Sequence, residues 1–397
     1  MHDDSAAPQR GVDAPRFRVR GTHRELVGRV KRPAVVVDLA GQGVVVVPGS
    51  RADGRLDTAV VLARSLGWPL LVLCSRGLAA PSVRRRLEPH TGLQLTAVDL
   101  LSTTGIRAHR PWQALEHRAA RQRAAIDTHR KRNLALLAAT MLGRRWVLFV
   151  DDDITGLEQG RVEAAVGHLT RRPQQHLVGW PYPHFPDNSV VHHARRDVLE
   201  LPQEVFIAGG ALLVDLADKV PAPFPPVYNE DWLFLFDALT ESAVVEGPDV
   251  RQEDYDPYAD PARAGLEEFG DVLGEGLFHL LHEQAAVEVA TDPVYWRDVL
   301  AKRRKLLGRI TERARELSAS GPDAQKMQQV VAAMTEARRQ HTWVTEESLA
   351  DFVRRWRADQ DTWAEFYAGL PRRDTVKEAL VYLGLHEAWI VTSGPKR

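Results

Sequence analysis

The segment that most constrains this chain is residues 147–153, where four apolar residues run directly into three aspartates. The apolar part is short and rich in β-branched and aromatic residues, and Gly143 precedes it as a helix stop, so we predict a buried strand. Side chains alternate along a strand, which would place Asp151 and Asp153 on one side and Asp152 on the other. Neighbouring carboxylates repel each other unless a cation or a proton lies between them, and hard oxygen ligands suit Mg²⁺ or Mn²⁺. The alternative is a solvated turn in which Asp153 caps the segment that follows.

Strand-like runs alternate with helix-like segments before this aspartate triplet. Such alternation predicts a parallel βαβ sheet with helices on both faces and ligands at the carboxyl ends of the strands. The loop Pro48-Gly49-Ser50-Arg51, Ser75 and the triplet each follow a strand, so we expect them to share one edge of one sheet. The strands are predicted at residues 34–38, 44–47, 70–74 and 93–98, of which the first two could be a hairpin or two consecutive strands. The helices are predicted at residues 57–66, 81–87 and 112–142. The basic residues of the last helix are predicted on its polar face.

Two further motifs lie in the second half of the chain. Gly209 and Gly210 interrupt an apolar run at residues 205–214, which indicates close approach of a ligand or another backbone. Glu230 and Asp231 precede an apolar helix at residues 233–239. Acidic residues at a helix start are also favoured by the macrodipole alone. From residue 294 onwards the apolar residues recur at helical spacing, which predicts a helical C-terminal region.

The composition narrows the class of protein. Lys and Arg number 52 against 53 Asp and Glu, so no overall basic field favours nucleic acid as a partner. Cys74 is the single cysteine, which excludes a disulfide within the chain and is typical of a reducing compartment. The polar, acidic N-terminus is unlike a secretory signal, and no apolar run is long enough to span a bilayer. We therefore expect a cytoplasmic protein without a membrane span.

Taken in order, three motifs resemble those of nucleotide-sugar-dependent glycosyltransferases of the GT-A fold. They are an Asp-x-Asp at residues 151–153, the basic segment Lys131-Arg132-Asn133 before that strand, and Gly209-Gly210 followed by Glu230-Asp231. The resemblance is to glycosyltransferase family 2 and to the glucosyl-phosphoglycerate synthase and mannosylglycerate synthase group, over roughly residues 40–290. It implies a Rossmann-like, mostly parallel sheet flanked by helices. The expected parts are an N-terminal extension (1–33), a transferase domain (34–293) with a nucleotide-binding half (34–155) and an acceptor half (156–293), and a helical appendage (294–397).

The resemblance also implies a chemistry. The donor would be a nucleoside diphosphate sugar, with UDP-sugars favoured, and Mn²⁺ or Mg²⁺ would neutralise the departing diphosphate. Asp153 would bind the metal, and Asp151 would bind the metal or the ribose. Asp231, with Glu230 beside it, is the candidate base for the hydroxyl proton of an acceptor that the sequence does not identify. The residues expected at the donor are Pro48, Gly49, Ser50, Arg51, Ser75, Lys131, Arg132, Asn133, Asp151, Asp152, Gly209 and Gly210.

The third metal ligand departs from the pattern of these enzymes, which often supply a histidine there. The corresponding segment, residues 244–252, ends in Gln252, whose amide oxygen is a weaker ligand for Mn²⁺. His279 is the alternative ligand; it lies three residues before His282 in an apolar segment, so the two could share one helix face. A histidine in such an apolar segment more often has a structural role.

Other functions compete with this reading. The run Asp151-Asp152-Asp153-Ile154-Thr155 also matches the leading motif of haloacid-dehalogenase-like phosphatases, but several strand–helix units precede it here, whereas that motif normally opens its domain. A sugar-nucleotide pyrophosphorylase would need a glycine-rich phosphate loop that residues 48–52 do not form. A degenerate transferase that serves as a binding module is the non-enzymatic alternative. A homodimer through the C-terminal helices is a further expectation.

Overall fold

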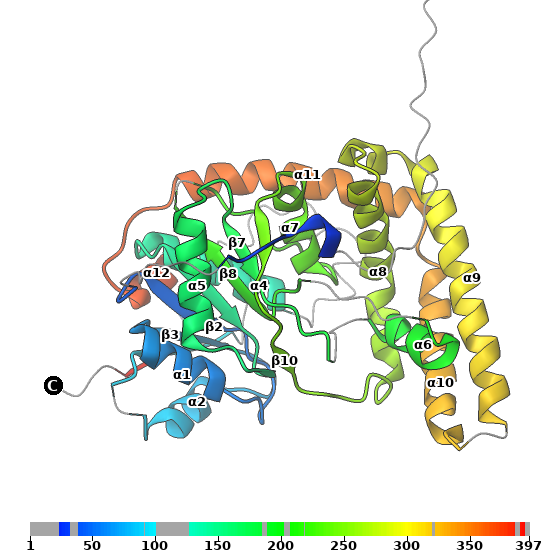
Figure 1. Ribbon diagram of the computed structural model, residues 1–397, viewed down its shortest axis with the longest axis horizontal. Helices are drawn as coiled ribbons and strands as arrows, with labels where there is room; N and C mark the ends of the chain where they lie inside the picture. Colours follow the sequence, from blue (N-terminus) through cyan, green and yellow to red (C-terminus); the bar gives the residue numbers. More distant parts are fainter. Residues whose placement is uncertain are drawn as a thin grey trace, which may run out of the picture.

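The computed structural model describes residues 24–31, 39–90, 92–100, 127–184, 189–201, 207–217, 219–319, 322–385 and 390–393. A mixed sheet with helices on both faces forms one part of the molecule, and long helices of the C-terminal region stand beside it (Figure 1). This arrangement confirms the predicted α/β class with a helical appendage. The predicted strand at residues 34–38 and the first part of the predicted helix at residues 112–142 lie outside the described residues.

Within the described residues the main sheet has nine strands in the order β1-β9-β7-β8-β5-β2-β3-β4-β11. Strands β5, β2, β3 and β4 run parallel, whereas β8 runs antiparallel between β5 and β7. The strands span Gly28–Arg29 (β1), Gly43–Val47 (β2), Leu70–Cys74 (β3), Leu95–Asp99 (β4), Trp146–Val150 (β5), Leu177–Gly179 (β7), Ala211–Asp215 (β8), Val244–Glu246 (β9) and Ile390–Ser393 (β11). A separate ribbon pairs Ile154–Thr155 (β6) with Arg251–Gln252 (β10).

Both faces of the sheet are buried, which explains why its strands are continuous apolar runs. Along β2, Val44 and Val46 face one core, and Val45 and Val47 face the other. Helices α4, α7 and α8 cover the first face, and α1, α2 and α5 cover the second. These helices and α6 span Asp57–Leu66 (α1), Ala80–Leu87 (α2), Thr128–Met141 (α4), Gln159–Thr170 (α5), Val190–Leu199 (α6), Glu230–Thr240 (α7) and Pro261–His282 (α8).

Helices α11 and α12 and the start of α9 extend the first core, whereas α10 and the rest of α9 form a third core with α6. Helix α10 packs on α8 and α9 at one end of the molecule, and α11 runs from there back across the sheet (Figure 1). A short 3-10 helix, Val287–Thr291, leads into this group. The helices span Pro293–Ser318 (α9), Ala324–His341 (α10), Glu346–Ala368 (α11) and Val376–Tyr382 (α12). None of the helices in the described ranges is both long and apolar enough to cross a membrane.

The start of α4 differs from the prediction of a basic polar face. Lys131, Arg132 and Asn133 are all buried. They lie there because the first turns of α4 reach the carboxyl edge of the sheet, where carboxylates and backbone carbonyls of other segments pair with them. A local pattern of charged residues could not indicate partners that come from distant parts of the chain.

Candidate active site

The aspartate triplet forms a turn at the carboxyl end of β5. The N–H of Ile154 donates to the carbonyl of Asp151 over 3.1 Å, which closes the turn. Antiparallel β8 begins beside this point, so the N–H of Asp151 donates to the carbonyl of Gly210 over 2.8 Å. The carbonyls of Asp152 and Asp153 accept from other loops, each over 2.9 Å. The triplet is therefore held by its backbone, and its carboxylates are presented from a fixed turn.

The carboxylates are grouped differently from the prediction. The Nη2 of Arg51 contacts the Oδ1 of Asp152 and lies 3.1 Å from the Oδ2 of Asp153. Arg132 instead pairs with Asp151, at 3.1 Å and 3.3 Å to its two oxygens. The expectation that Asp151 and Asp153 share one side, with Asp152 opposite, is wrong because the chain turns here and strand alternation ends at β5.

Arg132 links the triplet to the start of α7. Its Nη1 donates to the Oε1 of Glu230 over 3.1 Å, while its Nη2 binds Asp151. Burial alone would lower the pKa of Arg132, but the two carboxylates raise it, so the guanidinium stays charged. Burial raises the pKa of Asp151 to about 6, although Arg132 opposes this. A Cβ on Gly209 would collide with the Arg132 guanidinium, which explains the glycine.

Asp231 holds the same glycine loop. Its Oδ2 accepts from the N–H of Gly209 over 2.7 Å, and its Oδ1 accepts from the N–H of Trp232 over 2.9 Å. The next glycine, Gly210, faces Asp151 and the Tyr182 hydroxyl, each of which would lie 3.2 Å from an added Cβ. The two predicted motifs are thus in contact, although 22 positions separate Gly209 from Asp231. Sequence reasoning did not single out Tyr182, whose signal is its position just after β7.

Lys131 ties together the loops that follow β2 and β3. Its ammonium group donates to the carbonyl of Gly49 and to the Oγ of Ser75, both over 2.7 Å, and pairs with Asp127 at 3.0 Å. The side chain is fully buried, and burial lowers its pKa while Asp127 opposes the shift. Pro48, Gly49, Ser50 and Ser75 therefore lie next to one another at the sheet edge, as the βαβ pattern predicts.

Asn133 makes a different kind of contact from the one its motif suggests. Its amide donates to the carbonyl of Phe224 over 2.9 Å and accepts from the N–H of Phe224 over 2.8 Å. Phe224 stacks on Phe234 of α7 and lies under the guanidinium of Arg132, 5.5 Å from ring centroid to Cζ. Asn133 thus supports the wall beneath Arg132, and both ends of its amide are used there.

The oxygen groups beside the triplet suit a divalent cation. Gln252 lies next to Asp153 because β10 pairs with β6, and its Nε2 donates to the Oδ2 of Asp153 over 3.1 Å. Its Oε1 is buried and has no hydrogen-bond partner among the described residues. Rotation of the amide would turn this oxygen toward Asp153, and carboxylate and amide oxygens are ligands that Mg²⁺ and Mn²⁺ accept. His279, the alternative ligand, is buried in the last turn of α8.

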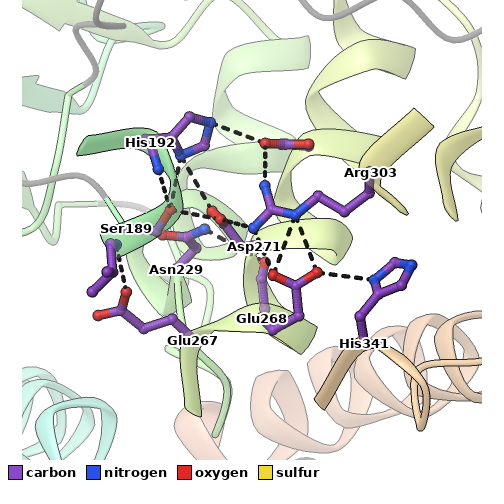
Figure 2. A network of polar contacts seen from close by, with 11 residues as sticks. Ser189, His192, Asn229, Glu267, Glu268, Asp271, Arg303 and His341 are labelled. Carbon is purple, nitrogen blue, oxygen red and sulfur yellow. Dashed lines mark hydrogen bonds and ion pairs between the residues drawn. The ribbon is translucent and has the colours of Figure 1, made fainter. Parts of the chain in front are cut away.

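A second group of acids lies between α6, α8, α9 and α10 (Figure 2). The ligand atoms of His192, Asp271 and Glu275 lie within 4.8 Å of one another, as a metal site would require. Arg303, however, already occupies the space between the acids, at 2.5 Å from Asp271, 2.7 Å from Glu268 and 3.0 Å from Glu275. We therefore interpret this group, the Arg303 cluster, as a buried ion-pair network.

The protonation of His192 supports this interpretation. Its ring nitrogens lie 3.5 Å from Asp271 and 2.9 Å from Glu275. Burial alone would lower the pKa of His192, but these carboxylates raise it to about 10. A protonated imidazole has no lone pair for a metal. Sequence reasoning missed this cluster because Arg303 is one of many charged residues in α9 and nothing in the local sequence marks it as buried.

The raised pKa of His192 predicts how stability depends on pH. Its contribution is fully present below the ordinary pKa of 6.5 and is lost as the pH rises toward 10. We expect the free energy of unfolding, measured in denaturant, to fall more steeply between about pH 6 and about pH 9.5 in the wild type than in His192→Gln. Parallel pH profiles for the two proteins would show that His192 is not protonated in the folded state.

The comparisons with known proteins found similar structures but no similar sequences. No protein-family model matches the sequence, and no curated protein matches it. A mannosyltransferase from Pyrobaculum calidifontis, solved with GDP-Man and Mn²⁺, is similar with a TM-score of 0.42 at 16% identity, covering 84% of this chain and 91% of that chain. Glucosyl-3-phosphoglycerate synthase from Mycobacterium tuberculosis, in complex with phosphoglyceric acid, gives 0.38 at 15% identity, covering 63% and 86%. Mannosyl-3-phosphoglycerate synthase from Rubrobacter xylanophilus gives 0.33 at 15% identity, covering 54% and 68%.

These structures include the synthase group whose motifs the sequence resembles. All three TM-scores lie below 0.5, so the function is inferred from the contacts of this chain at the carboxyl edge of its sheet.

Proposed function

We propose that the protein is a glycosyltransferase that moves a sugar from a nucleoside diphosphate sugar, with UDP-sugars favoured, to an acceptor hydroxyl. The observation that carries the proposal is the contact between the aspartate triplet and the start of α7. Arg132 pairs with both Asp151 and Glu230, which links the triplet to α7. Asp231, also at the start of α7, accepts from the N–H of Gly209 in the glycine loop. Groups suited to a diphosphate and groups suited to an acceptor proton thus lie on adjoining segments.

The loops after β2 and β3 would bind the nucleotide. Lys131 holds the carbonyl of Gly49 and the hydroxyl of Ser75 in one place. These loops are therefore already ordered, and nucleotide binding would cost them little conformational entropy. Asp153 and Gln252 would hold Mg²⁺ or Mn²⁺, which when bound supplies charge neutralisation to the diphosphate. Arg132, already charged between two carboxylates, would hold Asp151 in place.

Asp231 would take the proton from the acceptor hydroxyl. Asp231 is half-buried, so it is not closed off from a substrate hydroxyl. The two backbone N–H groups that it accepts from fix its orientation, which general base catalysis requires. Glu230 is the neighbouring acid, and its pairing with Arg132 leaves it suited to orienting that guanidinium.

The proposal is tested by nucleotide binding. In a thermal-shift and calorimetric screen with Mn²⁺, we expect UDP or another nucleoside diphosphate to stabilise the wild type. Asp153→Asn should fold normally but bind the same nucleotide about tenfold more weakly or worse in Mn²⁺, since it loses a charged metal ligand. Lys302→Ala, which removes an exposed ion pair on α9, is the matched control and should bind as the wild type does.

Two outcomes would contradict the proposal. If no nucleoside diphosphate binds in Mn²⁺, the protein is not a nucleotide-sugar transferase, and a binding module becomes the better interpretation. If the protein hydrolyses an aryl phosphate in a reaction that requires Asp151 and Asp153, and turns over no UDP-sugar, the phosphatase alternative is correct.

A further inference from the structure

Arg51 occupies the position at the triplet where a cation would be expected. Its Nη2 contacts Asp152 and lies 3.1 Å from the Oδ2 of Asp153. Gln252 donates to that same Oδ2 over 3.1 Å, so one carboxylate oxygen receives two donors. A guanidinium and a divalent metal ion neutralise the same charge on the same oxygens and cannot both occupy them.

The amide of Gln252 points to a ligand beyond this arginine. Its side chain lies next to Asp153 and is 94% buried, since its exposed fraction is 6%. Its Oε1 has no hydrogen-bond partner among the described residues, although a buried amide oxygen normally has one. A metal ion on Asp153 would give this oxygen a partner once the amide rotates and Arg51 leaves.

Hydrogen bonds hold the loop that carries Arg51, whereas the Arg51 side chain is partly exposed to solvent. The carbonyl of Arg51 accepts from the N–H of Gly54 over 3.2 Å, and Arg86 donates to the carbonyl of Gly54 over 2.8 Å. The side chain itself is 46% exposed, against 8% for Asp152. Movement of the guanidinium away from the triplet therefore requires rotation of one side chain at the surface and no rearrangement of the loop.

We propose that Arg51 is an exchangeable counter-cation, which neutralises Asp152 and Asp153 before the donor arrives and moves to the diphosphate when a divalent metal ion takes its place. The inference rests on the proposed function, because it assigns the metal and the diphosphate to this edge of the sheet. The metal ion and the donor would then bind cooperatively. A metal ion that binds alone must displace Arg51 from the carboxylates, and the guanidinium then has no other anion to pair with. When a diphosphate binds together with the metal, it gives the guanidinium a new anionic partner.

The test measures Mn²⁺ binding and needs no turnover. Mn²⁺ alone is titrated into the full-length wild type, Arg51→Ala and Arg51→Lys, with free Mn²⁺ followed by electron paramagnetic resonance. We expect Arg51→Ala to bind Mn²⁺ at least about tenfold more tightly than the wild type, since it removes a competing charge-assisted pair. Arg51→Lys keeps the positive charge and should stay within about threefold of the wild type. With UDP present, the advantage of Arg51→Ala should shrink or reverse.

Arg55→Ala is the matched control. Arg55 lies in the same loop, but its side chain is 65% exposed and pairs with Glu253 at 2.7 Å rather than with the triplet. Its loss should leave Mn²⁺ affinity unchanged. An equal gain in Arg55→Ala would mean that net charge alone controls metal binding, which overturns the inference.

The remaining outcomes separate the inference from the proposed function. If UDP binds the wild type in Mn²⁺ but Arg51→Ala shows no gain for Mn²⁺ alone, Arg51 is not a counter-cation and the proposed function stands. The same conclusion follows if the gain persists undiminished with UDP. If UDP fails to bind the wild type in Mn²⁺, the proposed function fails, whatever the metal titration of Arg51→Ala shows.

Discussion

Asp231→Asn is expected to lower the rate of sugar transfer by a factor of about 10²–10⁴, the usual contribution of a positioned general base. The substitution removes the proton acceptor while keeping nearly the same volume. One amide oxygen can still accept from the N–H of Gly209 or of Trp232, so part of the loop contact survives. The measurement is UDP release from a UDP-sugar with a set of hydroxyl acceptors on which the wild type turns over.

The measurement must separate two roles of Asp231: a general base, and a residue that only holds the glycine loop through the N–H of Gly209. A base predicts that UDP affinity in Mn²⁺ stays within about threefold of the wild type while turnover falls. A clamp predicts weaker nucleotide binding as well, since Gly209 lies against Arg132. Asp237→Asn, on the same helix but paired with Arg357 at 2.8 Å, is the control and should keep its activity. Turnover within tenfold of the wild type in Asp231→Asn would exclude it as the base.

Arg303→Ala is expected to reduce the free energy of unfolding by about 3–5 kcal/mol, the cost of leaving buried charges without their partner. Arg303 has a 1% exposed side chain and bridges Glu268 and Asp271 (Figure 2). It also pairs with Glu275 at 3.0 Å. Without it, these carboxylates would repel one another in a site that water does not reach. Chemical denaturation, followed by circular dichroism, measures the difference.

Arg313→Ala provides the comparison on the same helix. Arg313 pairs with Glu316 at 2.9 Å, but the two side chains are 51% and 66% exposed, so its loss should cost about 0–1 kcal/mol. Adding Glu268→Gln to Arg303→Ala should recover part of the lost stability, since it removes one of the unpaired charges. A loss below about 1 kcal/mol in Arg303→Ala would mean that these acids are protonated or hydrated in the folded protein.

The strands and first helices were predictable because their signals are local. The predicted helix at residues 57–66 and the predicted strand at residues 70–74 coincide with α1 and β3. Gly67 ends α1 in the left-handed conformation, with φ of 63°, which a glycine adopts without strain. Parallel pairing then followed from the alternation of strands and helices. The shared sheet edge of the loops after β2, β3 and β5 could therefore be derived before any contact was known.

The roles of single charged residues were not predictable in this way. Lys131 and Arg132 follow each other on α4, yet one binds the loops after β2 and β3 and the other binds Asp151 and Glu230. The side-chain periodicity of a helix says which face a residue occupies, but it does not say which distant groups lie opposite. The same limit applies to Arg303, which only the packing of α8 and α10 against α9 distinguishes from its exposed neighbours.

The sequence by itself determined the α/β class, the apolar strand that ends in Asp151, and the placement of residues 48–51, Ser75 and the aspartate triplet at one edge of the sheet. Those features depend on hydrophobic periodicity and on backbone preferences, which act over a few residues. Only the tertiary structure decided that Arg51 pairs with Asp152 and Asp153 while Arg132 pairs with Asp151. Ion pairing depends on distance in space, and Arg51 and Asp152, which are 101 positions apart in the chain, meet only when β2 and β5 lie side by side.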